Sequence, residues 1–256
     1  MSMNQILISE TLYVTPEIKR KKKLYKINFF IAVFLLCILF FYYIYAEYSR
    51  YQDSKESEQI LESLTFNINN QADSNIAFSD DTVRVVLNEE YVDEGDNIYE
   101  TKRTPEEQEK INKIIQSSMK RSASGDTYYS IGTISIPKIN LNYAILNKTT
   151  EELLKISPTR FWGKEPNEIG NLCIAGHNYR NNLFFSKVPQ LQNGDIIEIK
   201  DLLGEIVQYE VYDKFIVRPD DTSATSQYTN GKREITLITC TNDSVDRVII
   251  KAREVD

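Results

Sequence analysis

Residues 234–252 read EITLITCTNDSVDRVIIKA. Two runs rich in β-branched residues flank a polar turn of Thr, Asn, Asp and Ser, which predicts two neighbouring β-strands, 234–240 and 245–252. Because side chains alternate along a strand, Ile235 and Leu237 share one face and Cys240 falls on the other. In the second strand Arg247 points away from the apolar face, which consists of Val248, Ile250 and Ala252.

Short β-rich runs separated by turn residues continue back from this pair to Gly132. They predict strands at 131–136, 141–146, 172–175, 195–200 and 205–217. A short helix at 150–156 and a loop containing Trp162 and Pro166 are expected between the second and third of these strands. About 125 residues can bury a core without disulfides, so the pattern predicts a single all-β barrel or sandwich.

A membrane anchor is predicted near the N-terminus. Residues 19–26 read KRKKKLYK, and residues 27–46 are almost all apolar or aromatic, which is long enough to cross a bilayer as a helix. The basic flank places the tail 1–26 in the cytoplasm and everything after residue 47 outside. A cleaved signal peptide or a buried core helix are the alternatives. The length of the apolar run and the lack of small residues at the cleavage positions favour an uncleaved anchor.

Residues 47–127 are polar and rich in Asp, Glu, Asn and Ser, so we interpret them as an extracellular stalk before a catalytic domain at 128–256. One helix is expected in the stalk, from Thr104 to about Ser117. Thr104 supplies an N-cap with proline next and a glutamate at the third position. Its apolar residues recur at helical spacing and could dock on the following domain: Ile111, Ile114 and Ile115.

Composition excludes several classes of function. The net charge of −7 gives no basic patch of the kind that nucleic-acid binding needs. Three cysteines without a CxxC pair predict neither a disulfide framework nor a zinc site, and one histidine supplies metal sites poorly. We therefore expect no cofactor and no nucleic-acid partner. Acidic loops are plentiful without forming a recognisable calcium loop, which leaves activation by calcium open.

Three residues of the β-rich domain suggest chemistry: His177 after the strand LCIAG, Cys240 after ITLIT, and Arg247 at the start of RVIIKA. Cys and His side chains at strand ends are what thiol nucleophiles use when the fold joins them. Arginine adds a cation where negative charge develops. Each residue alone has an ordinary structural reading: a small buried hydrophobe, a turn cap or a solvated strand end.

The segments IAGHN at 174–178 and TLITC at 236–240, with an arginine seven residues later, resemble the sortase family of cysteine transpeptidases. GTISIPKI at 132–139 and NGDIIEI at 193–199 are also sortase-like, so the resemblance covers about residues 128–256. It implies a closed eight-stranded β-barrel with short helices. His177, Cys240 and Arg247 would line a groove on its wall.

The resemblance also implies a reaction. Cys240 would attack the threonine carbonyl of an LPxTG-like sorting signal, break the Thr–Gly bond and hold the protein as a thioester. An amine of the peptidoglycan precursor, or a pilin lysine, would then resolve it. His177 would move the protons and Arg247 would bind the oxyanion or orient the peptide. Thr239 and Ala175 are further candidates for substrate binding, Thr239 through its hydroxyl or backbone at the oxyanion site.

The implied setting is the membrane of a Gram-positive cell, crossed once, with surface proteins carrying a C-terminal sorting signal as substrates. No Asp-Pro-aromatic lid precedes the domain, and about sixteen residues between 217 and 234 are too few for a long helical insertion. These departures leave a housekeeping-type or a sporulating-bacterium-type sortase. Cys173 shares strand parity with His177 and is a possible competing nucleophile, although Cys240 has the motif context.

Two other functions remain open from the sequence. A hydrolytic protease of another fold would use the same thiol chemistry and release its product to water, although no GxSxG motif or second histidine is present. A degenerate, non-catalytic barrel tethered to the membrane could instead bind cell-wall components. Alkylation of Cys240 and transfer of a sorting peptide to an amine would separate these readings.

Overall fold

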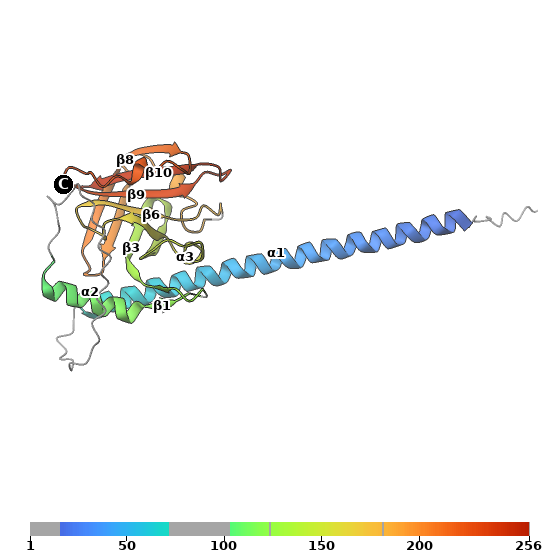
Figure 1. Ribbon diagram of the computed structural model, residues 1–256, viewed down its shortest axis with the longest axis horizontal. Helices are drawn as coiled ribbons and strands as arrows, with labels where there is room; N and C mark the ends of the chain where they lie inside the picture. Colours follow the sequence, from blue (N-terminus) through green and yellow to red (C-terminus); the bar gives the residue numbers. More distant parts are fainter. Residues whose placement is uncertain (1–15, 72–102, 123, 181, 256) are drawn as a thin grey trace, which may run out of the picture. The chain divides into compact units, whose positions relative to one another are not determined.

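The computed structural model describes residues 16–71, 103–122, 124–180 and 182–255. Within these residues, eight strands close into a barrel in the order β10-β8-β7-β3-β4-β5-β6-β9. Figure 1 shows the barrel and labels several of its strands. The β4–β5 and β6–β9 pairs are parallel and the others antiparallel. The strands are β3 (Ser130–Ile136), β4 (Leu141–Leu146), β5 (Thr159–Gly163), β6 (Gly170–Ala175), β7 (Ile196–Asp201), β8 (Ile206–Val217), β9 (Arg233–Cys240) and β10 (Arg247–Glu254).

The barrel confirms the predicted all-β class and the closed eight-stranded form. The expected loop around Trp162 is wrong in part, because Thr159–Gly163 forms β5 and pairs with β6. Alternation could not show this strand, since Phe161 and Trp162 are neighbours and both are exposed. Short helices join the strands: α3 (Glu151–Ile156), η1 (Pro137–Ile139), η2 (Val188–Gln190) and η3 (Ser223–Thr225).

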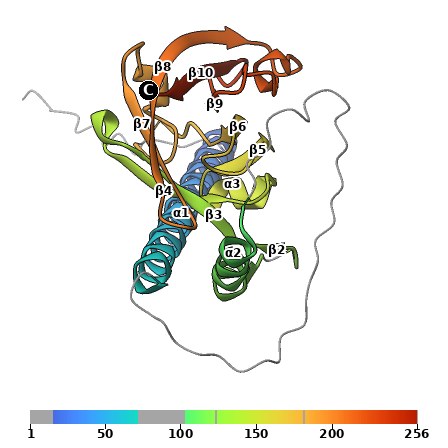
Figure 2. The same ribbon diagram turned by 90° about the vertical axis from the view of Figure 1, so that its left-hand side faces the viewer.

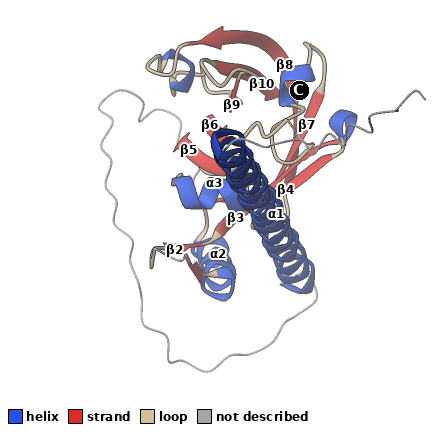
Figure 3. Ribbon diagram, turned by 90° about the vertical axis from the view of Figure 1, so that its right-hand side faces the viewer, coloured by secondary structure: helices blue, strands red, loops and turns tan. Residues whose placement is uncertain are grey.

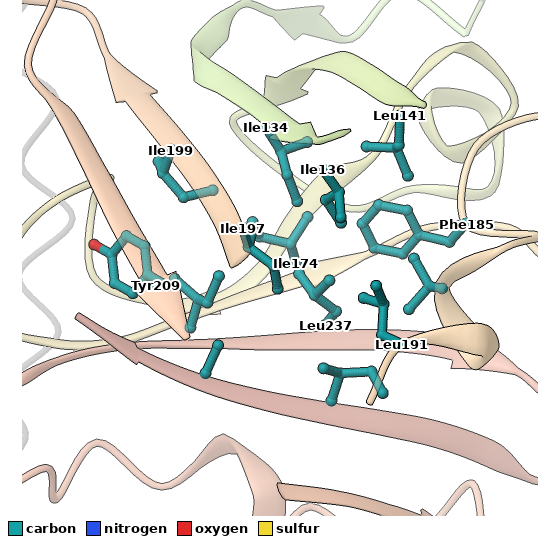
Figure 4. Packing of buried hydrophobic residues seen from close by; sticks show 14 of the residues in the cluster. Ile134, Ile136, Leu141, Ile174, Phe185, Leu191, Ile197, Ile199, Tyr209 and Leu237 are labelled. Atoms are coloured by element: carbon teal, nitrogen blue, oxygen red, sulfur yellow. The ribbon is translucent and has the colours of Figure 1, made fainter. Parts of the chain in front are cut away.

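The barrel interior is filled by the inward side chains of alternate strand positions, as Figure 4 shows. Large aliphatic residues dominate this core, and Phe185, from the segment after β6, lies among them. The predicted apolar faces are confirmed, because these residues are all buried in the same cluster: Ile235, Leu237, Val248, Ile250 and Ala252. Cys240 and Arg247 therefore belong to the outer face of the barrel wall.

The predicted stalk helix is confirmed as α2 (Pro105–Ser118). Thr104 caps it through the expected capping box: its hydroxyl accepts from the Glu107 N–H, and its own N–H donates to the Glu107 carboxylate. Ile111 and Ile114 are buried. Ahead of β3 lies a two-stranded ribbon of β1 (Lys120–Arg121) and β2 (Thr127–Tyr128).

The first helix, α1 (Pro16–Gln71), continues past the predicted anchor into the first part of the segment 47–127 that the sequence suggested was a stalk. The chain divides into two compact units, 1–51 and 52–256, so the last turns of α1 belong with the barrel. These turns lie beside α2 below the barrel in Figures 2 and 3, and the Asn67 amide donates to the Ser117 hydroxyl at 3.3 Å.

A second hydrophobic cluster attaches α1 and α2 to the outside of the barrel. Ile60, Leu64 and Ile68 follow one face of α1 at a spacing of four residues and are buried. They meet buried residues from α2, β2, β4, α3 and the turn after β7: Ile111, Ile114, Tyr128, Ala144, Leu146, Leu153, Ile156 and Leu202. The expectation of a polar stalk throughout 47–127 therefore needs correction for the end of α1, whereas residues 72–102 lie outside the described part.

The N-terminal unit contains a candidate membrane span. Among the described residues, Arg20–Ser49 is the one helical stretch long and apolar enough to cross a bilayer, judged by length and composition. An 18-residue window within it has a mean hydropathy of 2.5, and the stretch includes the whole predicted anchor 27–46.

Truncation of Leu64 should destabilise the protein, because its side chain is fully buried between α1 and the barrel. We expect Leu64→Ala to lower the free energy of unfolding by about 2–5 kcal/mol. Phe66→Ala, which removes a larger but exposed side chain from the same helix, should change it by less than about 0.5 kcal/mol. Urea unfolding of the full-length chain in detergent measures both, and equal effects would show that α1 does not pack as described.

Candidate active site

Three neighbouring strands bring the predicted site residues to one end of the barrel. β9 ends at Cys240 and lies between β6 and β10. Because β6 runs parallel to β9, its C-terminal end, which leads to His177, lies at the same end of the sheet. Because β10 runs antiparallel, its first residue, Arg247, lies there too. The directions of these three strands are therefore enough to bring Cys240, His177 and Arg247 to the same end of the sheet.

Cys240 and Arg247 are register partners across the β9–β10 pair. Both lie on the outer face, where side chains at directly opposed positions have their Cβ atoms about 4.5–5.5 Å apart. Both are partly exposed, and the thiol is free. Within the described part of the chain, the Arg247 guanidinium makes one hydrogen bond, from Nη1 to the Asp246 carbonyl at 3.2 Å. Its other N–H groups remain available to a ligand.

His177 is held against the end of β9 by hydrogen bonds on both sides of it. Ala175 pairs with Ile238, and the same register continued by two residues would set His177 opposite Cys240. Gly176 N–H donates to the Ile238 carbonyl at 3.1 Å. Beyond His177, the Asn178 side chain donates to the Cys240 carbonyl at 2.9 Å. The segment therefore keeps following β9 after β6 has ended.

Aromatic rings form one wall around His177. The Tyr179 ring lies 4.8 Å from the imidazole, between ring centroids, and 5.7 Å from the Phe184 ring. The Phe185 N–H donates to the His177 carbonyl at 3.0 Å. Gly176 makes this packing possible, because a Cβ there would lie 2.6 Å from the Phe185 ring. The loop is thus folded back tightly on the histidine.

The electrostatic surroundings favour neutral His177. Burial is the main cause that lowers the pKa of His177 below its ordinary value, and the nearby cation of Lys155 lowers it further. Glu151 opposes both by stabilising the imidazolium. Glu151 and Lys155 lie one turn apart on α3, which leads into β5 where Thr159 pairs with Ala175. The imidazolium is therefore the minor form at neutral pH.

The two proposed substrate-binding residues occupy different environments. Thr239 is buried, and its hydroxyl donates to the Gly176 carbonyl at 2.7 Å. That hydroxyl therefore holds the segment before His177 in place, which leaves only the backbone of Thr239 for the oxyanion role. Ala175 is partly exposed at the end of β6. Among the described residues, no group of three or more His, Cys, Asp or Glu side chains could hold a metal ion.

Cys173 does not share the surroundings of Cys240. Its side chain is fully buried, and burial raises the pKa of its thiol to about 12. The neighbouring Asn171 and Thr236 are also fully buried, and both donate hydrogen bonds to the Ala224 carbonyl in η3. The parity argument placed Cys173 on the outer face, but the segment around η3 covers this part of it.

Asn178 is a residue that the sequence pattern does not single out. Its amide bridges the loop after His177 to the end of β9, and this role depends on a register that the sequence does not show. The only local signal is its place directly after the histidine in IAGHN.

The barrel region is similar in sequence to known proteins. Residues 134–255 match the family model described as the sortase domain. Sortase A of Bacillus anthracis is 33% identical over 132 residues, which cover 50% of this chain and 61% of that protein. A solved Clostridium perfringens sortase D5 transpeptidase is 35% identical, with a TM-score of 0.49, over 59% of this chain and 89% of that one.

This chain contains a sortase domain. Sortase D of Bacillus subtilis is also similar, with 29% identity over 130 residues that cover 50% of this chain and 63% of that protein. The chain thus spans about three fifths of the length of these curated relatives. The matched region contains His177, Cys240 and Arg247 and begins within β3.

Because this chain has a single histidine, the imidazole signal in NMR belongs to His177 without assignment. In protein purified without a histidine tag, the titration of this signal should give a pKa of His177 below 6.5. Lys155→Gln should raise the pKa by removing a cation, and Glu151→Gln should lower it by removing an anion. Lys113→Gln on α2 is the control without effect. A midpoint above 6.5, or opposite responses at α3, would contradict this electrostatic description.

Cys240 and Cys173 should differ in their reaction with thiol reagents. At pH 7 the Cys173 thiol stays protonated, because burial raises its pKa to about 12, and the side chain is inaccessible to solvent. Iodoacetamide should therefore modify Cys240 and spare Cys173 in the folded protein, and should modify both after denaturation. Peptide mass spectrometry reads each site separately. Modification of folded Cys173 at the rate of Cys240 would refute the burial described above.

Proposed function

We propose that this chain is a sortase transpeptidase that cuts an LPxTG-like sorting signal between Thr and Gly and transfers the acyl part to an amine. The observation that carries the proposal is the pairing of Cys240 with Arg247, with His177 tied to the same strand end. A thiol, an imidazole and a guanidinium on one face of the wall supply a nucleophile, a proton carrier and an anion-binding group.

In the acylation step, the Cys240 thiolate attacks the threonine carbonyl carbon and a C–S bond forms. The carbonyl oxygen becomes an oxyanion, which the free N–H groups of Arg247 stabilise. The His177 imidazolium gives its proton to the glycine nitrogen as the C–N bond breaks. The products are a thioester on Cys240, neutral His177 and the released glycine segment.

In the transfer step, neutral His177 takes a proton from the incoming amine as its nitrogen attacks the thioester carbonyl. The C–S bond breaks, which restores the thiolate and the imidazolium. The lowered pKa of His177 suits this half of the reaction, because the base form predominates at neutral pH. No cofactor takes part in either step.

The proposed setting follows from the same family and from the N-terminal unit. The span within Arg20–Ser49 would anchor the protein once in the membrane, with the basic tail inside and the barrel outside. The substrates would be surface proteins with a C-terminal sorting signal. The acceptor would be an amine of the peptidoglycan precursor or a pilin lysine.

The test is turnover of fluorescent Leu-Pro-x-Thr-Gly peptides, with x varied, in the presence of glycine and lysine amines. Cys240→Ala should abolish cleavage and transfer, because a nucleophile has no substitute. His177→Ala should lose about 10²–10⁴-fold in kcat, since the chain has no second histidine. Arg247→Lys keeps the charge but loses the planar donor fork, and should lose most of the activity.

Cys173→Ser is the matched control, since it also removes one thiol from the same domain and should leave turnover close to that of the wild type. Folding of each variant is checked by circular dichroism. Cleavage by Cys240→Ala, or a folded Cys173→Ser without activity, would overturn the assignment. Release of product to water alone, with no amine adduct at any acceptor concentration, would favour a hydrolytic protease instead.

A further inference from the structure

The side chain of Asn178 connects two segments that carry the proposed catalytic residues. Its Nδ2 group donates to the Cys240 carbonyl at 2.9 Å and to Asn242 Oδ1 at 3.2 Å. Its Oδ1 accepts from the Arg180 N–H at 3.2 Å. The amide thus uses both N–H donors on the β9 side and its acceptor on its own loop, and this network fixes which way the amide points.

His177 therefore lies between two attachments to the same strand. On one side, Gly176 donates to the Ile238 carbonyl and accepts from the Thr239 hydroxyl. On the other side, Asn178 reaches the carbonyl of Cys240 itself. Regular β6–β9 pairing ends at Ala175. Among the described contacts, the Asn178 side-chain amide then provides the hydrogen bond to β9 beyond the end of the ladder.

We propose that Asn178 is a positioning residue, which holds the His177 imidazole in reach of the Cys240 thiol. The inference rests on the proposed function in assigning those two residues to the transfer reaction. It adds a part of the machinery that touches neither substrate nor reacting atoms. Proton transfer needs donor and acceptor within about 2.6–3.2 Å, so a small displacement of the loop would separate the pair.

Loop geometry explains why a side chain is needed here. Arg180, Asn182 and Phe184 all have positive φ values, which non-glycine residues adopt at a cost. The chain therefore leaves strand geometry directly after Asn178, and the hydrogen bonds of the Asn178 side chain hold the start of the loop beside β9. Asn178 also forms an isolated bridge with Phe184, so releasing its amide would loosen the ring wall around His177.

Asn178→Ala and Asn178→Asp test the proposal in the full-length protein. Alanine removes all three hydrogen bonds, whereas aspartate keeps the size and the acceptor for Arg180 but lacks both donors. Asn142→Ala, which truncates an exposed asparagine on β4, is the matched control. We expect both Asn178 variants to lose between about tenfold and a hundredfold in kcat with little change in KM, and the control to lose nothing.

A second readout does not depend on the peptide substrate. The pH profile of Cys240 alkylation reports the coupling of the thiol with His177, and peptide mass spectrometry isolates it from the other cysteines. The profile of Asn178→Ala should move towards that of His177→Ala, whereas Asn142→Ala should keep the wild-type profile. If Asn178→Ala fails to fold, the same comparison is made with Asn178→Asp.

The outcomes separate this inference from the proposed function. Shifted alkylation profiles in a protein that transfers no peptide would support the positioning role and refute the transfer reaction. Normal transfer with wild-type kcat and alkylation profiles in both Asn178 variants would refute the positioning role alone. Loss of activity with an unchanged alkylation profile would also refute it, because the amide would then serve the fold and not the His177–Cys240 pair.

Discussion

The site depends on the position of β9 between one parallel and one antiparallel neighbour. Because β6 is parallel to β9, its C-terminal end lies beside the end of β9. Because β10 is antiparallel to β9, its first residue lies there too. A slip of one residue in either ladder would turn Cys240 or Arg247 towards the interior. The buried alternate residues of all three strands oppose such a slip, so the core that closes the barrel also sets the register of the site.

The second cluster extends the domain beyond the barrel. Its residues on α1 and α2 pack against α3, whose Leu153 and Ile156 are buried there. The charged positions of the same short helix, Glu151 and Lys155, influence the pKa of His177. The apolar residues of α3 thus pack with the N-terminal helices, and its charged residues act on His177. The domain that supports the chemistry therefore includes the last turns of α1.

Much of the barrel was predictable because its strands alternate and its turns carry polar residues. β5 was not, since Phe161 and Trp162 are both exposed and its pairing with β6 is long-range. The end of α1 was missed because its buried residues are spaced through a polar sequence. Cys240 and His177 stood out by motif and by the scarcity of histidine. The role of Asn178 can be recognised only once the β6–β9 register is known.

The central claim is that Cys240, His177 and Arg247 form a single acyl-transfer site. Intact-mass and peptide-level mass spectrometry of the wild type, quenched in acid after incubation with a Thr–Gly sorting peptide and no acceptor amine, tests it most directly. The account predicts a mass increase equal to the peptide's threonine-terminated fragment, located on Cys240 and removed by an added amine. A cleaved peptide with no adduct on Cys240, or an adduct on another residue, would contradict it.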